Sequence, residues 1–264
     1  MCQLMSAGFV IINGDSINCY RLQNLFEKKK SCVMKPIITP KIDQNIAFQV
    51  KKITGDIRKA KGKHKPTITI SREFGCEGFP LANKIATRLS TGKTDWSVFS
   101  SDLLKEISDK NEYNREMLES LNESYRSQLQ QDLDVLISKK PSDYSRFKTI
   151  AQNLKIIGEK GNTIIVGSGG AVVAQNQPNF FHVRLTGNLQ FRVNRIAGLF
   201  SITIDEAANL VEERNLRRRD FIYRFTNKDI ADPSLYHLIL KNDFFSVDEM
   251  ADIIIHAMKA KKLL

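Results

Sequence analysis

A strand pattern, a loop with two glycines and a helical pattern follow one another between residues 66 and 89. Thr67–Ile70 is a β-branched run typical of a strand, and the loop after it, Ser71–Gly78, has glycines at positions 75 and 78. The helical pattern consists of apolar residues at four-residue spacing, Leu81, Ile85 and Leu89. In this order of elements, backbone N–H groups and a helix N-terminus converge and can bind phosphate. Glycine also serves any turn that needs positive φ, so the loop predicts either a phosphate cradle or a structural turn.

The loop is not a complete Walker A motif. That motif ends in Gly-Lys-Ser/Thr, whereas Gly78 is followed here by Phe79 and Pro80. No lysine of the loop therefore stands where it would reach the terminal phosphates of a nucleotide.

A second glycine-rich turn follows another strand pattern. Asn162–Val166 is an almost continuous apolar run of the kind buried in a parallel sheet, and Gly167-Ser168-Gly169-Gly170 comes directly after it. Ligands of open α/β sheets bind outside the carboxyl ends of strands. The second turn therefore strengthens the interpretation of the first loop as part of a ligand site.

Arginines gather late in the chain, at positions 214, 217, 218, 219 and 224. Phosphoryl transfer asks a protein mainly for positioning and positive charge, and the planar guanidinium binds phosphate oxygens in bidentate fashion. The alternative is a charged helix end, with Arg217–Arg219 in a last turn where cations complement the helix dipole. The cluster alone favours neither interpretation, but together with the two glycine turns it favours phosphate binding.

Strand and helix patterns alternate from residue 66 to the C-terminus. Further strands are expected at Trp96–Phe99, Phe180–Leu185 and Tyr236–Leu240. Helices are expected in the polar stretch Asn111–Lys140, at Phe147–Lys160, and after two capping boxes, Thr203 with Glu206 and Ser246 with Glu249. This alternation predicts an α/β protein with three layers and right-handed crossovers between parallel strands. We interpret His182 as a strand residue with a satisfied hydrogen bond rather than as a catalyst.

The composition allows one sizeable core, or one domain with a smaller appendage, because 42% of the 264 residues are hydrophobic. Residues 1–66 hold 13 Lys/Arg and 4 Asp/Glu, a net charge of +9, which leaves +2 of the total +11 for the rest. We therefore expect residues 1–65 to form a basic, partly disordered extension, and we favour this over a segment that binds nucleic acid. The sequence does not decide whether translation starts at Met1 or Met34.

The cysteines and apolar runs indicate the compartment. Four cysteines without CxxC spacing suggest neither a zinc site nor a disulfide framework, and no run of 18 apolar residues suggests a membrane span. We expect a cytoplasmic protein without a metal bound by the chain alone. Cys76 is expected to be a small loop filler rather than a thiol activated by the nearby helix start.

Five runs occur in an order and spacing that resemble the cytidylate kinase-like family. They are Thr67-Ile-Thr-Ile-Ser-Arg-Glu-Phe-Gly75, Ile165-Val166-Gly167, Phe181-His-Val-Arg-Leu185, Asn227-Lys-Asp-Ile-Ala-Asp-Pro233 and Leu235-Tyr-His-Leu-Ile-Leu240. The resemblance covers residues 66–264 and implies a three-layer P-loop kinase-like fold, with a central five-stranded parallel sheet, a helical insertion and an arginine-bearing lid. It also implies ATP and Mg²⁺, with a nucleoside monophosphate such as CMP, or another small phosphate acceptor, as substrate.

The resemblance assigns residues to three roles. The cofactor-binding residues would be Ser71, Arg72, Gly75, Cys76, Glu77 and Gly78. The substrate-binding residues would be Ser168, Gly169, Asp102, Arg192, Arg195, Arg214 and Arg219. The catalytic residues would be Arg184 and Arg218, the latter in the lid. Asp232-Pro233 would be a structural turn into the last strand.

Three positions depart from the family pattern. Ser168 stands where the family usually has an arginine, and Ser100 stands where an acidic residue commonly follows the second strand. Asn215-Leu216 replaces an Asp-Arg pair usual in the lid. Two functions therefore stay open: an ATP-dependent nucleotide kinase, and a nucleotide-binding module of the same fold with weak or no catalysis. The oligomeric state is open as well.

Overall fold

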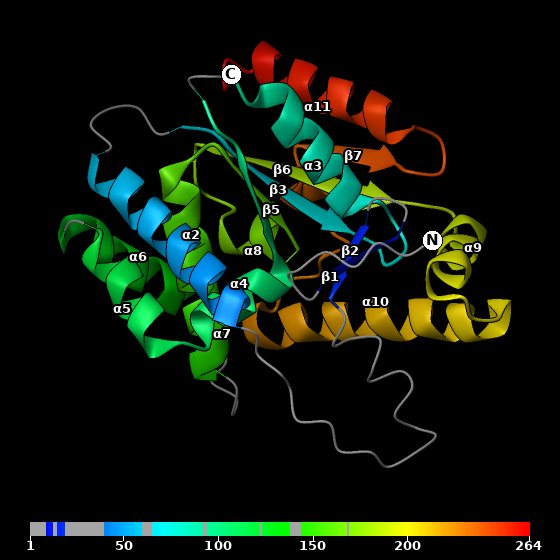
Figure 1. The fold of residues 1–264 in the computed structure, drawn as a ribbon, viewed down its shortest axis with the longest axis horizontal. Coiled ribbons are helices and arrows are strands. Elements are labelled where there is room, and N and C mark those ends of the chain that lie inside the picture. Colours follow the sequence, from blue (N-terminus) through cyan, green and yellow to red (C-terminus); the bar gives the residue numbers. More distant parts are fainter. Residues whose placement is uncertain are drawn as a thin grey trace.

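The computed structural model describes residues 9–12, 15–18, 40–59, 65–91, 94–121, 123–137, 144–167 and 169–264 (Figure 1). Five parallel strands form the central sheet in the order β4-β5-β3-β6-β7. They are β3 (Thr67–Arg72), β4 (Ser97–Ser100), β5 (Thr163–Val166), β6 (Phe180–Thr186) and β7 (Leu238–Lys241). This sheet confirms the predicted fold class. A separate antiparallel pair, β1 (Phe9–Ile12) and β2 (Asp15–Asn18), precedes it.

Helices cover both faces of the sheet, so the fold has the predicted three layers (Figure 1). One face carries α3 (Gly78–Leu89) and α11 (Val247–Ala260), and the other carries α7 (Tyr144–Lys160), α8 (Gly170–Val173) and α10 (Ile204–Thr226). The first face is closed by aliphatic side chains such as Ile70, Leu81 and Ile254, all fully buried. On the second face Phe147 of α7 stacks on Phe225 of α10, with ring centroids 4.5 Å apart.

Two groups of helices lie outside these layers. The insertion between β4 and β5 consists of α4 (Ser101–Ser108), α5 (Asn111–Glu119) and α6 (Glu123–Leu136), ahead of α7. The expected lid consists of α9 (Leu189–Phe200) and α10, which share a small apolar cluster of their own around Ile196 and Val211. No helix among the described residues is both long and apolar enough to cross a membrane.

Several boundaries differ from those expected. Strand β3 includes Ser71 and Arg72, and α3 already begins at Gly78, so the loop between them is only Glu73–Glu77. Pro80 is consequently the third helical residue and not the first or second, though it still lies in the first turn, where its missing N–H removes no intrahelical bond. The last strand begins at Leu238, because Asp232 and Pro233 open a short 3₁₀ helix, η1 (Pro233–Leu235). The structural turn expected at Asp232-Pro233 is thereby confirmed.

Helix α10 continues past Arg219 to Thr226, so Arg217–Arg219 do not lie in its last turn. The interpretation of these arginines as a charged helix end was wrong. The helix continues because Ile222 and Phe225 are buried against the core, and it ends where Asn227 adopts the left-handed conformation, with φ of 55°.

Helix α2 (Pro40–Lys59) lies within the extension expected to be partly disordered, and it packs against α4, α5 and α7 (Figure 1). Ile46, Val50 and Ile53 recur every three or four residues and are buried in the same core cluster as α7. Thr54 also donates a hydrogen bond to Glu116 of α5, at 3.1 Å. Packing therefore begins before residue 66. Apart from β1, β2 and residue 65, the rest of the basic extension lies outside the described part of the chain.

His182 is a structural residue, as predicted. Its Nε2 donates to the carbonyl oxygen of Ala174 at 3.2 Å, so Nδ1 accepts a hydrogen bond from the Thr69 hydroxyl at 2.7 Å. The ring also stacks on His237, with centroids 5.0 Å apart. Burial first, and then the neighbouring His237, lower the pKa of His182 from 6.5 to about 4.

Replacing a buried residue of α2 should destabilise the protein far more than replacing an exposed one. We expect Ile53→Ala to lower the free energy of unfolding by about 2–5 kcal/mol, since Ile53 is fully buried. Phe48→Ala, at a residue that is 64% exposed on the same helix, should cost about 0.5 kcal/mol or less. Urea denaturation measures both values. Equal effects of the two substitutions would show that α2 does not belong to the folded core.

Because the folded protein keeps His182 neutral, its free energy of unfolding should decrease as the pH is lowered. Between pH 6.5 and about pH 4 the unfolded chain binds a proton at this residue and the folded chain does not. The contribution is present in full above pH 6.5 and is lost as the pH falls to about 4, a loss on the order of 3 kcal/mol. Urea denaturation across this range should give a shallower pH dependence for His182→Gln than for the natural protein. His256→Gln, at an exposed histidine, is the control, and its pH dependence should match that of the natural protein.

Candidate functional site

The loop Glu73–Glu77 joins β3 to α3 at the carboxyl edge of the sheet and packs directly on α9. Gly75 has a φ of +98°, and a Cβ there would lie 2.7 Å from Arg192 Cβ and 2.9 Å from the Arg192 carbonyl oxygen. Glycine is therefore required at this position both for its backbone conformation and for the close approach of the two segments.

Three arginines of the lid contact backbone carbonyls of this region. Arg192 and Arg195 of α9 donate to the carbonyls of Phe74 and Gly75, and Arg218 of α10 donates to that of Arg72, each at 3.4 Å. The Arg218 guanidinium also lies over the Phe74 ring, 5.3 Å from its centroid. At this distance the hydrogen bonds are longer than is usual for N–H···O bonds and therefore weak. The guanidinium groups therefore hold the loop with bonds that a phosphate oxygen, which carries charge, would readily replace.

Two glutamates of the loop segment balance part of this charge. Glu73 Oε2 lies 3.4 Å from Arg192 Nε and accepts a hydrogen bond from the Gly187 N–H at 3.0 Å. Glu77 Oε1 lies 3.6 Å from Arg195 Nε. Arg192 is the more deeply buried arginine, with 10% of its side chain exposed, and it also donates to the Gly187 carbonyl at 2.9 Å. Its role is to fix the loop against the end of β6.

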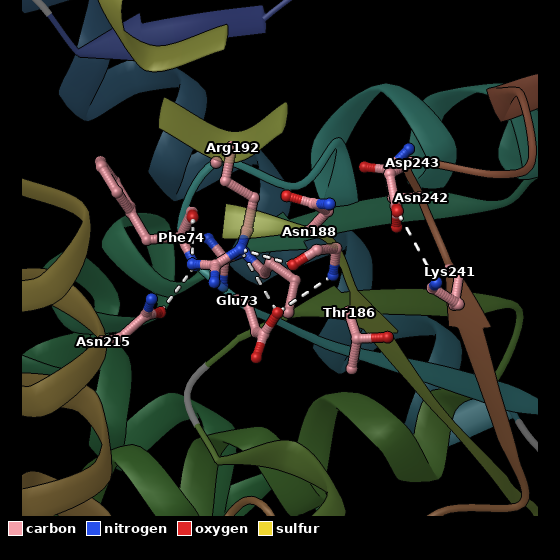
Figure 2. A network of polar contacts seen from close by, with 12 residues as sticks. Glu73, Phe74, Thr186, Asn188, Arg192, Asn215, Lys241, Asn242 and Asp243 are labelled. Atoms are coloured by element: carbon pink, nitrogen blue, oxygen red, sulfur yellow. Dashed lines mark hydrogen bonds and ion pairs between the residues drawn. The ribbon is translucent and has the colours of Figure 1, made fainter. Parts of the chain in front are cut away.

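Two asparagines accept N–H groups of the loop. Asn215 Oδ1 of α10 accepts the Phe74 N–H at 2.7 Å, and Asn242 Oδ1, just after β7, accepts the Glu77 N–H at 2.6 Å. Asn242 also donates to Glu77 Oε2 at 3.0 Å. Figure 2 shows Asn215 approaching Phe74 from α10, beside the contacts of Arg192 with Phe74 and Glu73. Two backbone N–H groups of the loop therefore already donate to side-chain amide oxygens of the protein itself.

The start of α3 supplies the donors that suit a phosphate. The N–H groups of the first residues of a helix have no partner within the helix. In α3 these residues are Gly78 and Phe79, because Pro80 has no N–H. The side chain of the N-cap residue, Glu77, forms no capping hydrogen bond with them. With the helix dipole and the lid arginines nearby, this end of α3 can bind an anion.

Arg72 crosses the carboxyl edge between β3 and β5. A Cβ at Gly78 would lie 3.1 Å from Arg72 Cδ and 3.2 Å from Arg72 Cγ, so the stem of the arginine passes beside the first residue of α3. A Cβ at Gly167, just after β5, would overlap Arg72 Nη1. The guanidinium therefore lies between the two glycine turns.

Cys76 is buried inside the loop, and burial together with Glu73 raises the pKa of its thiol to about 12. The burial of Cys76 agrees with a small residue that fills the loop, and its predicted contact with a nucleotide stays a prediction.

The structure gathers part of the predicted site. It brings together the loop, the start of α3 and four arginines, namely Arg72, Arg192, Arg195 and Arg218. Gly169, with φ of +69°, follows β5 at the same edge, and Ser71 pairs in register with Arg184. Ser168 lies outside the described residues.

Other predicted residues take part in contacts elsewhere. The Arg184 guanidinium is buried, donates to the Ile230 carbonyl at 2.5 Å and lies over the Tyr236 ring, so it ties β6 to the segment before β7. Arg219 is paired with Asp229 at 2.7 Å, and Arg214 is half-buried on α10. Asp102 lies in the first turn of α4, where Ser100 accepts the Leu103 N–H as N-cap. The predicted roles of these residues stay predictions.

The sequence did not identify Asn242 as a contact of the loop, and it marked Asn215 only as a departure from the family pattern. A signal for Asn242 was present, because it comes two residues after the strand pattern Tyr236–Leu240 and the carboxyl ends of parallel strands meet at one edge. No local signal could place Asn215 against Phe74, since the two residues are 141 positions apart and meet only through the fold.

The described residues hold no group of three or more histidine, cysteine, aspartate or glutamate side chains that could bind a metal ion. Asp243, beside Asn242, has an Oδ1 that is buried and accepts no hydrogen bond among the described residues. Its other oxygen lies 3.7 Å from Lys241 Nζ. A single carboxylate of this kind suits Mg²⁺, which usually keeps several waters and takes one or two protein carboxylates together with substrate phosphates.

Comparisons with known proteins identify the class to which this fold and site belong. Residues 67–243 match the model of the cytidylate kinase-like family. The chain belongs to this family.

Individual relatives are distant. The chain is 28% identical over 109 residues to a cytidylate kinase of Sulfolobus acidocaldarius, a match that covers 41% of this chain and 59% of that protein. A crystal structure of an uncharacterized protein from Eubacterium ventriosum matches with a TM-score of 0.57 and 18% identity, over 74% of this chain and 99% of that one. The second match supports the fold alone.

Removing the Asn215 side chain should loosen the loop. With Asn215→Ala the Phe74 N–H loses its acceptor, a net loss of about 1 kcal/mol, and hydrogen exchange of residues 73–78 should become about fivefold faster. Arg217→Ala is the matched control, because Arg217 lies two residues away on α10 and pairs only with Glu213 among the contacts of the described residues. Hydrogen exchange followed by mass spectrometry checks both variants. Unchanged exchange in Asn215→Ala would show that this hydrogen bond does not hold the loop.

Proposed function

We propose that this protein is a nucleotide kinase that transfers the terminal phosphoryl group of ATP to a nucleoside monophosphate. The observation that carries the proposal is the convergence of the lid arginines on the short loop before α3. Phosphoryl transfer needs positioning and positive charge around the transferred group, and this edge of the sheet offers both. Membership of the cytidylate kinase-like family supports the same conclusion and makes CMP the first acceptor to test.

In this proposal the start of α3 binds the ATP phosphates through the N–H groups of Gly78 and Phe79. Arg218 and Arg195 approach from the lid and stabilise the charge that develops on the transferred group. Arg192 keeps the loop in place through its contacts with Glu73, Phe74 and Gly187. The acceptor lies on the side of β5, next to Gly167 and Gly169, where the insertion helices begin at Ser101.

Mg²⁺ fits this site as a companion of the nucleotide. Bound between ATP phosphates it would neutralise charge during transfer, and Asp243 is the carboxylate that would join its coordination. The chain itself binds and orients the phosphates and excludes water when the lid closes. The four cysteines without paired spacing suit a cytoplasmic location.

A nucleotide-binding module without efficient catalysis is the second candidate. Asn215 and Asn242 already occupy two N–H groups of the loop, and Ser168 replaces an arginine usual in the family. In such a module ATP would bind without turnover.

Turnover distinguishes the two functions. The test measures ADP production with Mg-ATP and a panel of nucleoside monophosphates that includes CMP. A kinase should turn over at about 1–100 per second with its acceptor. Binding of Mg-ATP by calorimetry together with silence across the panel would favour the binding module.

Arg218→Ala should lower kcat about a hundredfold or more with a smaller change in the KM for ATP, because the guanidinium acts mainly on charge that develops during transfer. Arg217→Ala, at an arginine that is 70% exposed next to it on α10, should leave both constants nearly unchanged. Steady-state kinetics check both variants. A rise in KM with unchanged kcat in Arg218→Ala would place Arg218 in binding and not in transfer.

A further inference from the structure

One side of α10 is exposed although it carries two large apolar side chains. Leu216 is 57% exposed and Tyr223 is 50% exposed. They are seven positions apart, which is close to two helical turns, so they lie on the same side of the helix. In Figure 1 α10 runs along one side of the described fold. Two large apolar side chains together on an exposed helix indicate a surface at which another molecule binds.

The opposite side of α10 faces the rest of the protein. Ile222 and Phe225 are buried in the core. Asn215 and Arg218 form hydrogen bonds with the backbone of β3 and the loop after it. With about 3.6 residues per turn, these four residues lie on one side of the helix. The other side, which we call the outer face, consists of Glu213, Leu216, Arg217, Asp220, Tyr223 and Arg224, all exposed.

The outer face repeats one pattern of residue types twice. An acidic residue is followed by an apolar residue three positions later and by an arginine four positions later. The first repeat is Glu213, Leu216 and Arg217, and the second is Asp220, Tyr223 and Arg224. On the helix the apolar residues form one flank and the arginines the other, with the acidic residues between them. A seven-residue repeat of this kind is typical of a helix that packs along a second helix.

The outer face is complementary to the same face of a second copy when the two helices are antiparallel. A two-fold axis perpendicular to α10 keeps the apolar flank of one copy against the apolar flank of the other. With the axis midway along the outer face, Leu216 lies opposite Tyr223 of the partner subunit. The same axis brings Glu213 to the level of Arg224 of the partner subunit. Apolar groups and opposite charges therefore meet in one arrangement.

The inner charges obey the same two-fold axis. Arg217 comes to the level of Asp220 of the partner subunit, and the midpoints of all three pairs fall between residues 218 and 220. A parallel arrangement would instead bring each residue to the level of its own copy, arginine beside arginine and carboxylate beside carboxylate. Like charges placed together in an interface disfavour association. The charge pattern therefore selects the antiparallel arrangement.

We propose that the outer face of α10 binds the outer face of a second copy of this chain as an antiparallel, two-fold symmetric helix pair. Leu216 and Tyr223 form its apolar centre, and the ion pairs lie along one flank. Tyrosine and arginine are enriched in protein interfaces. Glu213 is paired with Arg217 of its own helix, and a carboxylate can accept hydrogen bonds from a second guanidinium as well. A contact of this size is at the low end of specific interfaces, so the Kd should be micromolar.

The inference goes beyond the proposed function and does not depend on it, because the outer face points away from the loop after β3. Sedimentation equilibrium of the full chain between about 1 and 300 µM should show a monomer that becomes a dimer. Leu216→Glu places a charge in the apolar centre and should weaken dimerisation about tenfold or more. Val135→Glu is the control, because Val135 is an apolar residue that is 85% exposed on α6, and it should leave the Kd unchanged.

A charge reversal provides the sharper experiment. Arg217→Asp brings two acidic groups together where the subunits meet, and Asp220→Arg brings two basic groups together. Each variant alone should therefore dimerise at least about tenfold more weakly than the natural protein. An equimolar mixture of the two variants restores opposite charges across the interface and should recover dimers. Arg217→Ala only removes an exposed charge and should weaken dimerisation much less. Thermal unfolding of each variant verifies that it is folded.

Three results would overturn the inference. The first is a natural protein that stays monomeric over the whole concentration range. The second is a dimer that Leu216→Glu weakens no more than Val135→Glu does, since another surface would then form it. The third is a mixture of Arg217→Asp and Asp220→Arg that contains no more dimer than either variant alone. Absence of kinase activity would leave the inference standing, because none of these measurements involves a nucleotide.

Discussion

The parallel pairing of β3 with β5 and β6 is the constraint on which the site depends. Ile70 lies opposite both Val166 and Val183 in register, so the three strands end at one edge. The loop after β3, the glycine turn after β5 and the turn after β6 therefore meet, although 114 positions separate Glu73 from its hydrogen-bond partner Gly187. A slip by one residue would move Thr69 into the apolar layer under α3 and Ile70 against His182. The fully apolar layer on one side of β3 and the Thr69–His182 hydrogen bond on the other exclude that slip.

Charge at this edge is arranged in opposed pairs with an excess of arginine. Arg72, Arg192, Arg195 and Arg218 lie around a segment that carries only Glu73 and Glu77. Each glutamate lies beside one arginine of α9, so α9 is close to neutral at the loop. The four arginines outnumber the two glutamates of the loop, and this favours an anionic ligand at this edge of the sheet.

Much of the fold could be predicted from sequence because local patterns and tertiary packing agree. The β-branched run of β3, the buried run of β5 and the two capping boxes each specify their element within a few residues. Where prediction failed, burial by distant segments decided the outcome: Ile222 and Phe225 extend α10, and the basic composition of the extension concealed the apolar face of α2. The loop could be recognised as a site from its glycines, but Asn215 and Asn242 reach it only through the assembled sheet and lid.

The two asparagines have a thermodynamic consequence for any ligand of the loop. Because Phe74 and Glu77 already donate to amide oxygens, the conformational entropy of ordering this loop is part of the free energy of folding. A ligand then exchanges hydrogen-bond partners on an ordered surface and need not order a disordered one. Its association with this segment should consequently lack the large negative heat-capacity change and the unfavourable entropy of coupled folding and binding. The loop is therefore preorganised: in the free protein, Asn215 and Asn242 take the place of a ligand as hydrogen-bond acceptors.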